Sequence, residues 1–101
     1  SWEETLEGLG LNRDEAFELL AYLLEQGEFI RLKEDLILPK KTLEQAKTRI
    51  QELIRQKGPV GVGELRDALG SSRKVVIPLL EYFDRVRFTR RIGDARTLAE
   101  A

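Results

Sequence analysis

The chain has 101 residues, of which 42% are hydrophobic and 35% are charged, and its formal net charge is −1. It contains neither Cys nor His, which excludes disulfides, thiol nucleophiles and the usual zinc and haem sites. Its apolar runs are much shorter than the roughly 20 residues that span a bilayer. We therefore expect a soluble, helix-rich, cytoplasmic protein with no membrane partner.

The near-neutral total conceals an uneven distribution of charge. Residues 1–38 have a net charge of −7, whereas residues 39–70 and 71–101 each have a net charge of +3. Such asymmetry is typical of a chain whose basic part meets a polyanion.

The first part of the chain predicts a helix followed by a hairpin. Asn12 and Glu15 have the spacing of a capping box, so a long helix is expected to start there. Gly27 ends this helix. Residues 29–32 and 36–38 then have the composition of two short strands around a polar turn.

The middle of the chain predicts two more helices. Thr42, with Gln45 three residues later, predicts the cap of a long helix that Gly58 and Pro59 end. Residues 62–69 predict a short helix, which a glycine follows.

The last part of the chain predicts a helix and a second hairpin. Ser72 is expected to cap the helix. Residues 86–92 and 95–98 predict two strands, joined by a two-residue turn at Gly93 and Asp94.

The same unit occurs twice, displaced by 60 residues. The displacement places Tyr22 on Tyr82 and, with one residue deleted after the helix, Phe29 on Phe88. Each copy has a short helix, a long helix and a hairpin, but only the second copy has a long leading helix. Helix, helix, helix and hairpin is the order of a winged helix-turn-helix.

The predicted fold class is therefore mainly α with small β-hairpins (α+β), arranged as tandem winged-helix domains. Residues 1–40 are assigned to a first domain that is incomplete at its N-terminus because it lacks its leading helix. Residues 41–101 are assigned to a second, nucleic-acid-binding domain.

Few residues offer catalytic chemistry. The turn that contains Gly61 and Gly63 is not followed by the Lys and hydroxyl of a phosphate-binding loop. The adjacent carboxylates Glu34 and Asp35 are expected to be solvated surface charge. We expect a non-catalytic chain that holds no cofactor and no metal.

Cations at one helix start point to an anion. Arg73 and Lys74 fall in the first turn of their helix, where the partial positive charge of the helix terminus makes cations unfavourable. The first copy has Asp14 and Glu15 in that turn, as the helix dipole favours. A bound phosphate would turn the cost in the second copy into a benefit.

The second hairpin repeats this pattern. Its turn places Arg91 opposite Arg96, with Arg90 beside them, and like charges that face one another destabilise a hairpin. Asp94 can relieve one of the two arginines, and an anion can relieve both.

An alternative interpretation needs no anion. The same cations could form a solvated face with local salt bridges to Glu81, Asp84 and Asp94. Arg85 and Arg87, which lie away from the helix start, are expected to be ordinary surface residues.

Part of the second copy resembles a known family. The stretches that carry the resemblance are Glu64-Leu65-Arg66-Asp67, Ser72-Arg73-Lys74, Ile77-Pro78-Leu79-Leu80-Glu81-Tyr82-Phe83-Asp84, Thr89-Arg90-Arg91, and Gly93-Asp94 with Arg96. They are similar to the last winged-helix domain of the bacterial selenocysteine-specific elongation factor. The rest of the chain resembles the preceding winged helix more loosely. One departure is Val86-Arg87-Phe88, where the family resemblance implies a Gly-containing turn.

The resemblance implies an RNA-binding module of a GTP-binding translation factor. The parent protein would use GTP and Mg²⁺ and bring selenocysteyl-tRNA to the ribosome, tethered to an mRNA hairpin, the selenocysteine insertion element, near a UGA codon. We expect the module to be a monomer. The residues expected at the RNA, from the resemblance and the charge pattern together, are Ser72, Arg73, Lys74, Arg90, Arg91, Asp94 and Arg96.

Two other functions stay open from the residues alone. One is a DNA-binding winged helix of a transcription regulator, and the other is a protein–protein scaffold whose basic face meets an acidic partner. The predicted recognition helix has few polar residues after Lys74, namely Glu81 and Asp84, which suits a DNA major groove poorly. RNA is instead read in loops with splayed bases, so an RNA hairpin is favoured.

Overall fold

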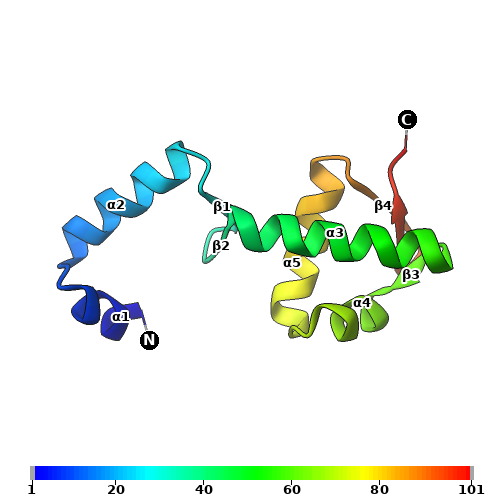
Figure 1. The fold of residues 1–101 in the computed structure, drawn as a ribbon, viewed down its shortest axis with the longest axis horizontal. Coiled ribbons are helices and arrows are strands. Elements are labelled where there is room, and N and C mark those ends of the chain that lie inside the picture. The colour runs from blue at the N-terminus through cyan, green and yellow to red at the C-terminus, as the bar shows by residue number, and fades with distance from the viewer. Residues whose placement is uncertain (1, 101) are drawn as a thin grey trace.

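The computed structural model describes residues 2–100 as an elongated molecule with principal extents of 47 × 26 × 20 Å (Figure 1). In chain order its elements are α1 (Trp2–Leu9), α2 (Arg13–Glu25), β1 (Phe29–Lys33), β2 (Leu36–Pro39), α3 (Lys40–Lys57), β3 (Val60–Gly61), α4 (Val62–Leu69), α5 (Arg73–Arg85), β4 (Thr89–Ile92) and β5 (Ala95–Leu98). Over these residues the chain is mainly helical with small antiparallel sheets, which confirms the predicted class. Within the same range, no helix is long and apolar enough to cross a membrane.

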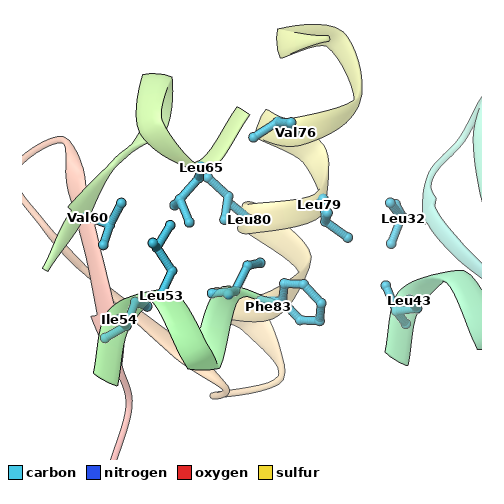
Figure 2. Close-up of a cluster of buried hydrophobic side chains, with 11 residues drawn as sticks. Leu32, Leu43, Leu53, Ile54, Val60, Leu65, Val76, Leu79, Leu80 and Phe83 are labelled. Atoms are coloured by element: carbon cyan, nitrogen blue, oxygen red, sulfur yellow. The ribbon is translucent and has the colours of Figure 1, made fainter. Parts of the chain in front are cut away.

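The core lies in the second unit, which runs from α3 to β5. The apolar stripes of its three helices face one another, and Ile50, Leu65 and Leu80 are fully buried. Figure 2 shows Phe83 of α5 reaching toward α3. Each such side chain contributes about 1.5–3 kcal/mol by leaving water. The strand order β3-β5-β4 places the second hairpin at the end of α3 that lies far from the first unit (Figure 1).

The first unit, which runs from α1 to β2, has the same order of helix and hairpin, but its long helix α2 is less buried by other elements. α2 starts at the predicted capping box, in which the Asn12 side chain accepts from the Glu15 amide at 2.8 Å. α2 extends away from the second unit (Figure 1). Leu19 on α2 is 45% exposed, whereas the equivalent Leu79 on α5 is 4% exposed. A covered apolar core is therefore found in the second unit.

The two units meet at a β-bulge in the first hairpin. β1 has one extra residue between Arg31 and Lys33 when it pairs with β2, and this residue is Leu32. The bulge turns Leu32 into the core of the second unit, where it is 3% exposed and lies beside Leu79 (Figure 2). The Arg85 Nη2 atom donates to the carbonyl of Leu32 at 3.0 Å. The first hairpin and the second unit thus share one hydrophobic cluster.

The bulge also corrects the predicted alignment of the two units. Phe29 pairs with the last residue of β2, and Thr89 pairs with the last residue of β5. Phe29 therefore corresponds to Thr89 and not to Phe88, as the sequence comparison predicted. The one-residue difference between the copies falls at Leu32 inside the hairpin.

The predicted start of the long middle helix is wrong. α3 begins at Lys40, with Pro39 as an extended N-cap, so Thr42 lies inside the first turn. The Lys40 amide donates to the carbonyl of Glu28 at 2.8 Å, which makes Lys40 both the last rung of the hairpin and the first helical residue. The strand leads directly into the helix, and a separate cap is not needed.

The predicted start of the last hairpin is also wrong. β4 begins at Thr89, because the chain first makes a turn in which Arg87 has φ of 62°. Gly27 has φ of 78° at the equivalent position of the first unit. The turn that the family resemblance implies is therefore present, with an arginine in the position of the glycine.

Candidate nucleic-acid interface

The start of α5 is held by a tight turn after α4. Gly70 ends α4 in the left-handed conformation, and Ser72 follows as the N-cap in extended conformation. Ser72 occupies the predicted position, but its side chain makes no capping hydrogen bond, unlike Asn12 in the first unit. The first amides of α5 therefore lack the side-chain acceptor that α2 has, and their partial positive charge stays available to an external acceptor.

Arg73 and Lys74 lie in the first turn of α5 and are exposed. Within residues 2–100, the structure gives neither side chain an ion pair or a hydrogen bond. The alternative of local salt bridges is therefore wrong for these two residues. The turn also lacks an acidic residue, so its positive charge is uncompensated.

The second hairpin, or wing, has the predicted register. Arg91 is the Cα partner of Arg96, and Gly93 and Asp94 form the turn. Arg91 donates from Nε to the carbonyl of Gly93 at 2.8 Å, and its Nη2 lies 3.6 Å from Oδ1 of Asp94. Both side chains of this ion pair are largely exposed, so the pair is weak, and another anion can replace the Asp94 carboxylate beside Arg91.

Arg96 differs from the other cations of the wing because it is only 4% exposed. Its Nε donates to both carboxylate oxygens of Asp84 at 3.1 and 3.2 Å, and the Thr89 hydroxyl donates to the same carboxylate at 2.7 Å. Arg91 and Arg96 thus each have a carboxylate partner within the fold, so the repulsion between them is relieved without a bound anion. Arg96 ties the wing to α5.

Asp84 and Thr89 are positioning residues that the sequence analysis did not include in the site. Asp84 lies in the last turn of α5, where the helix dipole disfavours an acid. That local conflict was a visible signal of a nearby cation.

A shallow depression separates the start of α5 from the wing. Its lining residues are Val62, Gly63, Arg73, Ile77, Leu80, Glu81, Arg91, Asp94 and Arg96. The structure thus brings together four predicted residues, which are Arg73, Arg91, Asp94 and Arg96. Its walls offer guanidinium donors and carboxylate acceptors side by side, so the site can bind a phosphate together with a polar base edge.

Three predicted residues lie outside this depression. Ser72 and Lys74 flank it at the helix start. Arg90 is exposed on β4, and because side chains alternate along a strand, it projects from the face of the wing opposite to Arg91. In the described part of the chain the Arg90 side chain also has no ion pair or hydrogen bond. No group of His, Cys, Asp or Glu among residues 2–100 is arranged to hold a metal ion.

Known proteins are similar to this chain in sequence. Residues 52–98 match a family model described as the winged helix of elongation factor SelB. Over 93 residues the chain is 30% identical to the selenocysteine-specific elongation factor of Desulfomicrobium baculatum. The aligned region covers 92% of this chain and 15% of that protein. Over 52 residues it is 44% identical to the same factor of Escherichia coli. This aligned region covers 52% of this chain and 8% of that protein.

The fold is also similar to a solved structure, that of the mRNA-binding domain of elongation factor SelB from Escherichia coli in complex with SECIS RNA. The TM-score is 0.82 at 28% identity, over 97% of this chain and 81% of that one. The chain spans only a small part of the full-length relatives. Residues 52–98 are therefore similar to the winged helix of elongation factor SelB, and the fold of the chain is similar to that of the SelB mRNA-binding domain.

Proposed function

We propose that this chain is the mRNA-hairpin-binding module of a selenocysteine-specific elongation factor. It would hold the parent factor and its selenocysteyl-tRNA at a selenocysteine insertion element near a UGA codon. The observation that carries the proposal is the uncompensated positive charge of Arg73 and Lys74 at the start of α5, beside an arginine-bearing wing.

The physical argument rests on phosphate binding. Phosphate oxygens accept from guanidinium, ammonium and helix-start amides, and all three are present at the start of α5. The depression beside them adds Glu81 and Asp94, whose carboxylates can accept from a base edge. An RNA loop presents phosphates and splayed bases together, which fits this mixture of donors and acceptors.

A similar solved structure that contains RNA supports an RNA hairpin as the partner. The Escherichia coli domain that matches with a TM-score of 0.82 is described in complex with SECIS RNA. The residues that we propose to contact the hairpin are Ser72, Arg73, Lys74, Arg90, Arg91 and Asp94, while Arg96 acts by holding the wing in place.

The remaining roles follow from the parent factor. Residues 41–101 would form the RNA-binding domain, and residues 1–40 would belong to an acidic winged helix that acts as a spacer. The module itself would be a non-catalytic monomer, whereas the parent protein would bind GTP and Mg²⁺, meet the ribosome and work in the cytoplasm.

The test compares two ligands of equal length. The affinity of the 101-residue chain is measured for an RNA hairpin with a loop and for a DNA duplex, each over a range of salt concentrations. We expect tighter binding of the hairpin, with log affinity falling by about 0.7 per contacted phosphate for each unit of log salt. Tighter binding of the DNA duplex would overturn the proposal in favour of a transcription regulator.

A further inference from the structure

The turn that follows α5, at residues 86–88, carries one cation, Arg87, at the opposite end of the helix from Ser72. Arg87 is exposed in this turn, and the Lys47 ammonium of α3 lies 4.9 Å from the ring centroid of the adjacent Phe88. α5 has 13 residues, so this surface lies about 20 Å from the helix start. It is therefore separate from the depression beside the wing.

Arg87 is held in a conformation that disfavours an arginine. Among residues 2–100 it is the non-glycine residue with positive φ, at 62°, and this conformation costs about 1–2 kcal/mol for a residue with a Cβ. Gly27 fills the equivalent position of the first unit without that cost. Within the described residues the Arg87 side chain makes no hydrogen bond and no ion pair. Within the described residues, the charged head of Arg87 therefore adds no hydrogen bond or ion pair to the fold.

The same turn has the opposite charge in the first unit. Glu25 lies two residues before Gly27 and Glu28 directly after it, whereas Arg85 and Phe88 occupy these positions around Arg87. Because the backbone hydrogen bonds of the two turns are equivalent, the fold does not require either charge.

The cations near the C-terminal end of α5 differ in whether they have a hydrogen-bond or carboxylate partner within the fold. Arg85 donates to the carbonyl of Leu32 and lies 5.8 Å from the Tyr82 ring centroid, so it serves the contact between the units. Lys47 and Arg87 have no carboxylate partner in the described structure, and the stacking on Phe88 orients the Lys47 ammonium beside the turn.

We infer that Lys47 and Arg87 form a second RNA-binding surface, which contacts the backbone phosphates of an RNA duplex. Two exposed point charges suit backbone contacts, which are independent of sequence. Duplex RNA is bound mainly through its shape and backbone, so such a surface can hold a stem or a neighbouring duplex. This role goes beyond the binding of a hairpin loop at the start of α5.

The test uses a blunt-ended RNA duplex without a loop and the 101-residue chain. We expect Arg87→Gly and Lys47→Ala each to weaken binding roughly three- to tenfold at low salt. Arg87→Gly should leave the melting temperature unchanged or raise it, since it removes the strained conformation. The matched control is Arg49→Ala, which removes an equal charge from the same helix, where Arg49 pairs with Glu52 at 3.8 Å.

Two outcomes would overturn the inference. One is an equal loss for Arg49→Ala and Lys47→Ala, which would mean that only the total charge matters. The other is that Arg87→Gly no longer weakens duplex binding once Arg73 and Lys74 have both been changed to Ala. That result would mean that duplex RNA binds at the helix start alone. Because the probe has no loop, the result is independent of whether the hairpin is bound as proposed.

Discussion

The two units use the same helix and turn to build different surfaces. α2 and α5 each have 13 residues, and both are followed by a residue with positive φ, Gly27 in one and Arg87 in the other. In the first helical turn, α2 carries Asp14 and Glu15, whereas α5 carries Lys74 and no acid. The shared fold sets where side chains stand, and the residues at those positions decide which unit can bind a polyanion.

The hairpins differ in a related way. Arg96 is buried against Asp84 in the second unit. The register of the first hairpin and the turn after α2 place apolar residues, Ile37 and Leu24, at the equivalent positions. The second unit therefore has an ion pair that fixes the wing where the first unit has two apolar residues.

The largest predicted effect comes from breaking this ion pair. Asp84→Leu leaves the guanidinium of Arg96 buried without its carboxylate, so we expect a loss of about 3–5 kcal/mol in the free energy of unfolding. Adding Arg96→Ile recreates the apolar pair of the first unit and should bring stability back to within about 1 kcal/mol of the original protein. Denaturant unfolding of both variants measures the difference.

The control for this pair is an exposed one. Asp67→Leu removes a carboxylate that lies 3.5 Å from Arg66 and is 77% exposed, and it should change stability by less than about 0.5 kcal/mol. A double variant no more stable than Asp84→Leu alone would show that the apolar residues of the first unit cannot hold the wing.

The second largest predicted effect on stability comes from weakening the contact between the two units at the bulge. Leu32→Ala removes a side chain that is 3% exposed in the shared cluster, so we expect it to cost about 2–4 kcal/mol in unfolding free energy. It should also speed hydrogen exchange in the first hairpin. Lys33→Ala, one residue later on an exposed position, is the control. Equal effects of the two substitutions would refute the shared core.

Local signals predicted the elements that local interactions determine. The short helix has the predicted bounds, Val62 and Leu69, and the pairing of Arg91 with Arg96 follows from the two-residue turn. The sequence also placed Arg73 in the first turn of its helix, where the structure has it.

The features that sequence reasoning missed depend on distant contacts. Thr42 has the local pattern of a cap, but the hydrogen bond from Lys40 to Glu28 starts the helix earlier. The buried state of Arg96 depends on Asp84, which lies 12 residues away. The bulge at Leu32 has no composition signal, because the site that accepts the side chain is formed by the other unit.

The smallest predicted effect compares the two helix caps. Asn12→Ala breaks a formed capping box and should cost about 1 kcal/mol in stability. Ser72→Ala removes a hydroxyl that makes no capping bond, so it should cost less than about 0.5 kcal/mol. Thermal unfolding measures both. If Ser72→Ala cost as much as Asn12→Ala, the Ser72 hydroxyl would be a structural cap and not a free group at the site.

The central claim is that polyanion binding belongs to the start of α5 and not to the start of α2. The most direct measurement is the affinity for an RNA hairpin against salt, for Arg73→Ala with Lys74→Ala and for Arg13→Ala, whose position in α2 matches that of Arg73. We predict that the double variant loses about 10- to 100-fold in affinity at low salt and about 1.4 in the slope of log affinity against log salt, while Arg13→Ala keeps both. Equal losses at the two helix starts, or an unchanged slope in the double variant, would contradict the account.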